Sequence, residues 1–423
     1  MENKVVITGV GLVSSLGNDF DTTWKKLLEG ESGISRIDDF DIEGFKCPYG
    51  AIVHGLDSDE LKIHKKDSRV MDRHAYMLLK SSRDAFQSSS IDLELTPPEC
   101  VGYFAAMGMV DYHIDDLAAA VIHAMDDDGK LNYEKFFSGA YENIHPLWPL
   151  SMLNNINFCQ AAIDLGIKGE NVVFCPHSAA SIHAVIEAYH TVLEKKADLA
   201  LAGGVSEKIS PMSLTRASLV NLLNNDRGVC HPFATDANGT ILGEGAGIMA
   251  LELLASAKKR NLPALAWIKG YGASFGRSAE AGCPSEKAIS LSINDTLTMS
   301  GVDPDEIDLI IAHGDGTPGG DGNELNSICS VFHHCLDNLH IFSSKAALGH
   351  SLSGASAIDM VLGTYMLKHS IIPAINNRYE ADKRIEKSLV REKPLKKDIK
   401  NILINSQSYE GQCASIIIGA MEE

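Results

Sequence analysis

Residues 172–184 read Val-Val-Phe-Cys-Pro-His-Ser-Ala-Ala-Ser-Ile-His-Ala. The apolar run from Val172 to Phe174 ends at Pro176, and the small residues after it begin a helical pattern. This order predicts a strand-to-helix turn that carries Ser178. A side chain at such a turn is exposed at the end of a sheet, where N–H groups of the helix start can stabilise an oxyanion. Taken alone, the stretch favours a simpler interpretation, a small-residue helix start packed against a strand.

The composition narrows the class of protein. With 423 residues, 45% of them hydrophobic, the chain can bury a large core and could by length form two or three domains. The net charge of −19, from 37 basic and 56 acidic residues, argues against nucleic acid or an anionic membrane as the main partner. The nine cysteines show no paired spacing, and neither a secretory segment nor an apolar run of about 18 residues occurs. We therefore expect a cytoplasmic protein.

Two similarities within the sequence predict an internal duplication. Residues 5–11 form an apolar strand pattern that ends in glycines, and residues 267–272 repeat its shape. Residues 174–180 are similarly echoed by residues 342–347, and each segment is followed by a helical pattern and a short apolar strand. We expect an α/β fold of two similar halves that join near residues 256–264.

The expected division places residues 1–255 in an N-terminal half and residues 256–423 in a C-terminal half. Residues 111–136 are acidic and predict a surface excursion with one short helix at Leu117–Met125. Residues 379–400 are charged and lack periodicity, which predicts a surface connection. Both halves are expected to pack against each other as one body.

Two histidines and a lysine occupy positions that suit catalysis. His313 follows an apolar strand at Leu309–Ala312 and precedes a glycine-rich turn, which predicts an imidazole at the edge of the sheet. Lys345 and His350 follow another strand and lie among small residues. If the halves are pseudo-symmetric, the turns at Ser178, His313 and Lys345 can converge on one cleft. A lysine at a helix start is unfavourable, which predicts a specific partner for Lys345.

Short motifs extend the pattern from one end of the chain to the other. They are Val-Ile-Thr-Gly-Val-Gly near the start, Met71-Asp72-Arg73, Ala202-Gly203-Gly204, Leu242-Gly243-Glu244-Gly245-Ala246, His313 with Asp321 and Glu324, and Lys345 with Gly349-His350. In these motifs the chain resembles the β-ketoacyl-acyl-carrier-protein synthases, condensing enzymes of the thiolase-fold group. The resemblance implies a thiolase-like fold, with two pseudo-symmetric βα halves in a layered αβαβα arrangement.

The resemblance also implies roles for individual residues. In the family a cysteine takes the acyl chain from a carrier protein, and two histidines help to decarboxylate a malonyl thioester whose carbanion attacks the acyl-enzyme. Ser178 lies at the cysteine position, and His313 and His350 match the two histidines. Lys345 matches the lysine that orients the site, and Glu324 matches a buried structural carboxylate. No cofactor is expected.

Serine at the cysteine position weakens the implied chemistry. A thiol is partly ionised near neutral pH, whereas a hydroxyl needs a base within about 3 Å. An acyl-serine is also a poorer donor than a thioester for carbon–carbon bond formation. Decarboxylation is less affected, because His313 and His350 can still donate to the enolate oxygen. Ser178 is therefore a weak nucleophile, a vestigial residue or an engineered replacement.

The C-terminal loop departs from the family as well. Tyr409 aligns with a gating aromatic residue whose backbone N–H serves the oxyanion hole, and Glu410 replaces a glycine that would allow loop motion. The run Ala179-Ala180-Ser181 resembles chain-length factors, relatives that have lost the nucleophile and pair with an active ketosynthase. Those relatives usually lose the histidines that this chain keeps. Two functions stay open: a ketosynthase-like enzyme of type II fatty-acid or polyketide biosynthesis, and a non-condensing chain-length factor.

A basic cluster is the expected docking surface for an acyl carrier protein. The cluster comprises Lys62, Lys65, Lys66, Arg69 and Arg73, and we assign the docking role to Lys65, Lys66 and Arg69. In the family this region receives the acidic carrier. We further expect a homodimer or a heterodimer with a conventional ketosynthase.

Other conspicuous side chains receive simpler interpretations. His177 and His183 are expected to be packing or surface residues. Residues 329–335 contain two cysteines and two histidines, but helical spacing sends these side chains to different faces, so no metal site is expected.

Overall fold

A computed structural model describes most of the chain, namely residues 4–111, 115–151, 153–175, 177–223, 227–279, 282–375 and 379–421. Pro176, which ends the apolar run before Ser178, lies outside these residues. The main elements of the first part of the chain are β1 (Val5–Ser14), α1 (Phe20–Leu28), α2 (Arg73–Ser88), β4 (Val101–Met107), α6 (Asn154–Leu165), β5 (Asn171–Phe174), α7 (Ala180–Leu193), β6 (Leu199–Val205) and β7 (Gly245–Leu253). After the short helix α9 (Leu254–Lys259), the second part supplies β8 (Ala266–Phe275), α10 (Glu286–Ser300), β9 (Leu309–Ile311), α11 (Pro318–Val331), β10 (His340–Phe342), α12 (Lys345–Leu348), α13 (Ala355–His369), β13 (Asn401–Gln407) and β14 (Gln412–Gly419).

The strand order shows the duplication that the sequence predicts. The large mixed sheet has the order β10-β9-β13-β14-β8-β1-β7-β6-β4-β5. Counted from the edge strand β5, the first strand set runs third, second, fourth, fifth, first in chain order, and the second set runs in the same order from β10. The sets meet where β1 and β8 pair antiparallel, with Val6 opposite Trp267. The expected boundary at residue 255 stays a prediction.

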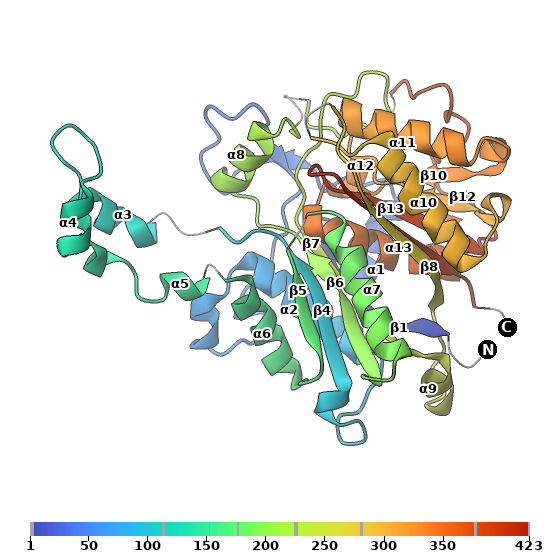
Figure 1. The fold of residues 1–423 in the computed structure, drawn as a ribbon, viewed down its shortest axis with the longest axis horizontal. Coiled ribbons are helices and arrows are strands. Elements are labelled where there is room, and N and C mark those ends of the chain that lie inside the picture. Colours follow the sequence, from blue (N-terminus) through green and yellow to red (C-terminus); the bar gives the residue numbers. More distant parts are fainter. Residues whose placement is uncertain are drawn as a thin grey trace.

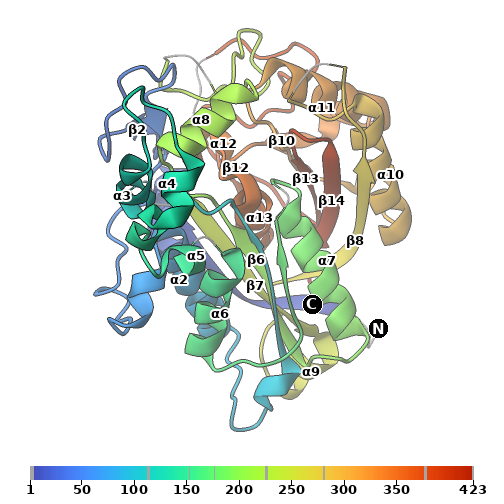
Figure 2. The same ribbon diagram turned by 60° about the vertical axis from the view of Figure 1, so that its left-hand side comes forward.

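Two helices fill the space between the strand sets (Figures 1 and 2). Helix α7 contacts β4 and β6 of the first set and β14 of the second, and α13 contacts both β7 and β13. Along β6, Ala200 and Ala202 pack toward α7, whereas Leu199 and Leu201 face the side of α2, as the two-residue strand period requires. With α10 and α11 outside the second set, the layers follow the expected αβαβα order.

The central helix α13 explains how charged groups come to be buried. Of its 15 residues, 12 are buried, including Asp359, because strands of both sets pack against it. A helix of this kind can bring a carboxylate into the core only where a partner neutralises it.

An arm extends from the body at the left of Figure 1. It contains α3 (Asp115–His123), α4 (Tyr133–Ser138) and α5 (Trp148–Ser151). The predicted surface excursion is confirmed, but its first helix lies two residues earlier than Leu117–Met125, and α4 was not predicted. Phe137 is 70% exposed on this arm.

The segment 379–400 is less superficial than its charge predicts. Ile385, Leu389 and Val390 are buried in the main core, and β12 (Leu395–Lys396) pairs with β11 (Ile371–Ile372). A few apolar side chains anchor this segment in the core, while its charged residues face solvent. Because these apolar residues do not recur at a regular spacing, the sequence pattern does not reveal the anchoring. Among the described helices, none has the length and apolar character needed to cross a lipid bilayer.

Candidate active site

Ser178 lies on the turn between β5 and α7, as predicted, and is buried under the second strand set. Its Oγ is 3.2 Å from His350 Nε2, and the residue is 1% exposed. The Ser178 carbonyl accepts hydrogen bonds from the hydroxyls of Ser356 on α13 (2.9 Å) and Ser406 on β13 (2.6 Å). Residues of the second part of the chain therefore fix the backbone of the candidate nucleophile.

His313 follows β9 directly and is held from two sides. The buried carboxylate of Glu324, on α11, accepts the N–H groups of His313 (2.9 Å) and Gly314 (2.8 Å). The Gln407 N–H donates to His313 Nδ1 at 3.4 Å, which leaves Nε2 to carry the proton of a neutral ring. The position of Glu324 thus agrees with the structural role that the resemblance implies.

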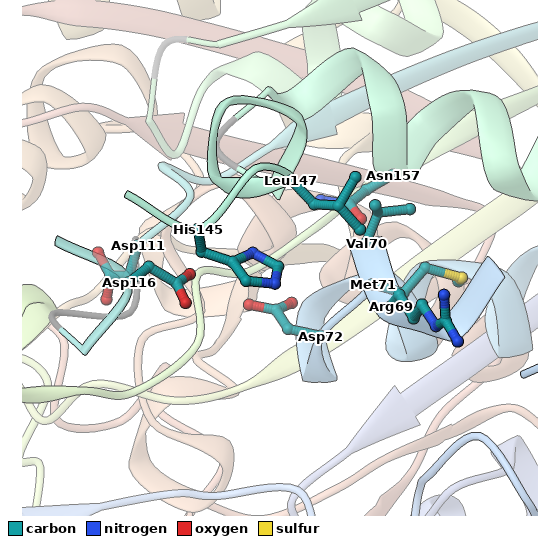
Figure 3. Close-up of a pocket in the computed structure, with 9 residues that line it drawn as sticks. All are labelled: Arg69, Val70, Met71, Asp72, Asp111, Asp116, His145, Leu147 and Asn157. Atoms are coloured by element: carbon teal, nitrogen blue, oxygen red, sulfur yellow. The ribbon is translucent and has the colours of Figure 1, made fainter. Parts of the chain in front are cut away.

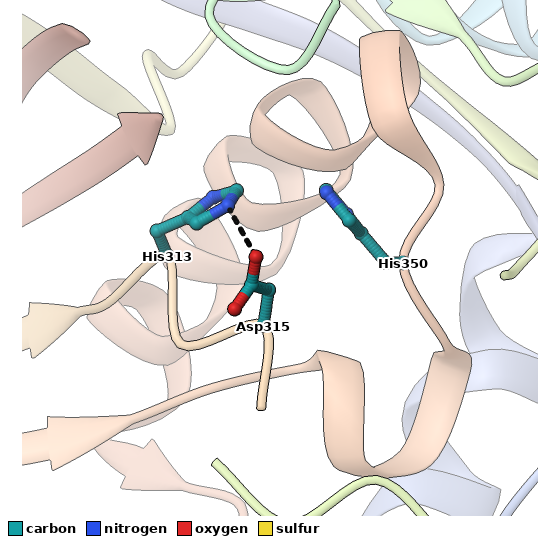
Figure 4. Close-up of side chains that lie close together, drawn as sticks. All are labelled: His313, Asp315 and His350. Carbon is teal, nitrogen blue, oxygen red and sulfur yellow. Dashed lines mark ion pairs between the residues drawn. The ribbon is translucent and has the colours of Figure 1, made fainter. Parts of the chain in front are cut away.

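Asp315 is a charged member of the site that sequence analysis did not single out. Gly314 and Gly316, on either side, have φ values of 43° and 81°, in the left-handed region that glycine adopts readily. The resulting turn places Asp315 Oδ2 3.6 Å from His313 Nε2 (Figure 4). Burial would raise the pKa of Asp315, but its interactions with His313 and the charge of His350 hold that pKa well below its usual range. A carboxylate two residues after a histidine on a glycine-rich turn was the available signal.

His350 completes the contact between the halves. Its ring lies nearly perpendicular to that of His313, with centroids 5.0 Å apart. Its backbone N–H donates to Ile241 O at 2.7 Å, which anchors it to the first part of the chain. Burial, and then the charge of His313, lower the pKa of His350 well below 6.5. A neutral imidazole can accept the Ser178 proton, although a lowered pKa makes it a weak base.

Lys345 begins α12 and has the specific partner that its position predicts. The Lys345 Nζ atom is 2.5 Å from Asp359 Oδ2, and both side chains are almost fully buried. The Ser344 hydroxyl donates to the other oxygen of Asp359 at 2.5 Å. The charge of Lys345 also lowers the pKa of His350, so the ammonium acts on the same chamber. Asp359 could not be paired with Lys345 from sequence, because the two lie on different helices.

His177 is more than the packing residue that the sequence suggests. It is buried, and its Nε2 lies 2.5 Å from the Tyr409 hydroxyl and 3.5 Å from a Glu410 carboxylate oxygen. Burial, followed by the charges of Glu410 and Glu207, raises the pKa of Tyr409 to about 12. The hydroxyl therefore stays protonated near neutral pH and shares a hydrogen bond with His177. Tyr409, the expected gating residue, is thus fastened to the residue before Ser178.

Among the described residues, one buried group could hold a metal ion. The ligand atoms of His313, Asp315 and His350 lie within 4.8 Å of one another. Two imidazoles and a carboxylate are donors that Zn²⁺ accepts. Asp315 already faces His313, however, and His350 already faces Ser178, so we interpret the group as an acid–base cluster.

The predicted docking residues Lys65, Lys66 and Arg69 are exposed on and beside a short 3-10 helix, η1 (Asp67–Val70). Arg73 is not free to join them, because it pairs with Asp39 (2.7 Å) and with the buried Glu244 (3.0 Å).

A cavity of about 160 Å³ adjoins Arg69 at the base of the arm. Figure 3 shows His145 between Asp116 and Asp72, with the Arg69 side chain turned away from them. Asp111 also lines this cavity and pairs with Arg216 at 2.7 Å. An acidic carrier would be attracted to the exposed lysines rather than to this cavity. Carrier docking stays a prediction.

The chamber thus brings together Ser178, His313 and His350, with Lys345 and Glu324 in support. Cys175, the nearest cysteine in the sequence, is exposed and lies outside it.

Comparison with known proteins decides the family. The family model described as the β-ketoacyl synthase N-terminal domain matches residues 2–257, and the C-terminal domain of the same family matches residues 265–378. The chain belongs to the β-ketoacyl synthase family. The resemblance drawn from the motifs is confirmed.

Individual β-ketoacyl synthases are similar to this chain over its full length. The chain is 26% identical to the 3-oxoacyl-(acyl-carrier-protein) synthase 2 of Staphylococcus aureus strain COL, with 99% of each chain covered. It is 27% identical to the protein of the same name from Coxiella burnetii, with 99% of this chain and 98% of the relative covered. The solved structure titled "The ishigamide ketosynthase/chain length factor" superposes with a TM-score of 0.86 at 26% identity, covering all of both chains. The thiolase-like fold expected from the sequence is therefore confirmed.

Proposed function

We propose that this β-ketoacyl synthase handles acyl and malonyl thioesters of an acyl carrier protein in type II fatty-acid or polyketide biosynthesis. It acts as an acyltransferase that loads an acyl group onto Ser178, and decarboxylative condensation is its slow half-reaction. The observation that carries the proposal is the 3.2 Å contact between Ser178 Oγ and His350 Nε2 in a chamber shared with His313. The names of the relatives support a carrier-bound substrate.

The acyl transfer can be written from the groups in place. His350 accepts the Ser178 proton as Oγ attacks the thioester carbonyl, and the backbone N–H of Tyr409 is the candidate donor to the oxyanion. The carbon–sulfur bond then breaks, and the carrier's sulfur takes up the proton. The product is an acyl-serine ester and a free carrier thiol. Condensation is slow because this ester is a weaker acyl donor than a thioester.

The test is acylation by hexanoyl-loaded carrier protein, followed by intact mass spectrometry and peptide mapping. We expect a slow hexanoyl adduct on Ser178, no adduct with S178A, and at least about tenfold faster loading with S178C, because a thiol is the stronger nucleophile. An unmodified wild-type protein together with an unmodified S178C variant would contradict the proposal.

A second function is favoured by the serine and by the solved relative that is titled a ketosynthase/chain length factor. In that case the chain pairs with a conventional ketosynthase and shapes its pocket without chemistry of its own. Exposed apolar groups support a partner: Val172 on the edge strand β5 is 38% exposed. Purification from the native host separates the two, because recovery as a homodimer without any second ketosynthase argues against the chain-length-factor function.

A further inference from the structure

Asp315 is a buried charge that the proposed acyl transfer does not use. The N–H and the hydroxyl of Thr317 both donate to Asp315 Oδ1, at 2.8 and 2.7 Å. This pair fixes the carboxylate and leaves Oδ2 directed at His313 Nε2, as Figure 4 shows. The carboxylate is therefore held in one orientation inside the chamber.

Asp315 contributes a negative charge to the chamber. Its pKa is held below the usual range, so it is ionised at neutral pH. Burial, and then the charge of Asp315, raise the pKa of the nearby Asp321. The Lys345 ammonium is already paired with Asp359. Asp315 faces the imidazole of His313 directly, and the charge of His350 also acts on it.

This charge opposes the malonyl half-reaction. An enolate oxygen bound to His313 Nε2 at about 2.9 Å would lie within about 6.5 Å of Asp315 Oδ2, given the 3.6 Å contact. A malonyl group enters with a carboxylate of its own, and decarboxylation moves negative charge onto the thioester oxygen. Like charges at such separations repel strongly where water is excluded. A neutral acyl thioester brings no charge of its own into the chamber and therefore binds without this repulsion.

We infer that Asp315 determines the specificity of the chamber, favouring neutral acyl groups over malonyl groups. The inference rests on the proposed function and names which of its two thioester classes the site accepts. It also gives a second reason, independent of the Ser178 hydroxyl, for slow condensation.

The experiment measures binding without reaction. Hexanoyl- and malonyl-pantetheine amides, in which nitrogen replaces the reactive sulfur, are titrated calorimetrically into wild type and D315N. We expect wild type to bind the hexanoyl amide at least about tenfold more tightly than the malonyl amide. D315N keeps the shape but loses the charge, so its malonyl affinity should rise about tenfold or more while its hexanoyl affinity changes little. D337N, which removes an exposed acid that does not line the chamber, should match wild type.

The outcomes separate this inference from the proposed function. A malonyl-to-hexanoyl ratio that is the same in wild type and D315N would overturn the role of Asp315 and leave acyl transfer standing. Binding of neither amide by any variant would contradict the proposed function itself. If D315N folds poorly by circular dichroism, D315S replaces it, and a gain of acetyl product from malonyl-loaded carrier protein supplies a second readout.

Discussion

The lowered pKa of His350 makes the free energy of unfolding depend on pH. Burial, and then the charge of His313, depress its pKa in the folded chain, whereas in the unfolded chain it titrates near 6.5. Below that pH the unfolded chain binds a proton that the folded chain does not, so stability is lost as pH falls through 6.5. H350Q should reduce this loss by up to about 1.4 kcal/mol per pH unit, measured by urea unfolding between pH 6.5 and 5. Equal slopes for wild type and H350Q, with the exposed-site control H54Q, would refute the assignment.

The buried ion pair of Lys345 and Asp359 leads to a second prediction at the residue scale. K345M leaves Asp359 buried without its cation and should lower the free energy of unfolding by about 3–5 kcal/mol. The double variant K345M/D359L removes both charges and should recover most of the loss. The half-exposed pair of Lys80 and Asp84 on α2 is the control, since K80M should cost no more than about 1 kcal/mol. A double variant as unstable as K345M would show that the charges do not act as a pair.

The residues of the chamber differ in whether their roles could be predicted from the sequence. Ser178, His313 and His350 could be predicted because each follows an apolar strand within a recognisable motif. Asp359 and His177 could not, because their partners, Lys345 and Tyr409, come from other elements and only folding brings them together.

At the level of elements, the edge strand β5 makes a prediction about association. It pairs with β4 on one side, and its apolar Val172 is exposed. V172K should therefore weaken the expected dimer, homodimeric or with a ketosynthase, without unfolding the chain. Size-exclusion chromatography with light scattering measures the mass, and L291K, at an exposed leucine on α10, is the matched control. If V172K associates as wild type does, β5 is not the contact surface.

Elements with a clear period could be predicted, and others could not. The strand at residues 5–11 appears as β1, because a continuous apolar run is a local signal. The arm helix α4 and the anchoring of Ile385 carry no such signal. The position of Ile385 depends on contacts with distant parts of the chain, whereas α4 has six residues, too few to show a period, and packs against the neighbouring α3.

On the scale of the whole molecule, the duplication is what builds the chamber. The shared strand order brings the turn after β5 and the turn after β9 to a common interior, with α7 and α13 between the sets. Neither half alone holds both the hydroxyl and the imidazoles. The expectation that similar halves converge on one cleft agrees with this geometry, whereas the catalytic roles rest on the proposal.

The most direct test of the central claim, that Ser178 accepts the acyl group in a chamber built by both halves, is a crystal structure of the protein after prolonged incubation with hexanoyl-pantetheine. We predict electron density continuous from Ser178 Oγ into the acyl chain, with His350 Nε2 within hydrogen-bonding distance of the ester. Density that starts from another side chain such as Cys175, or a Ser178 that points away from both imidazoles, would contradict the account.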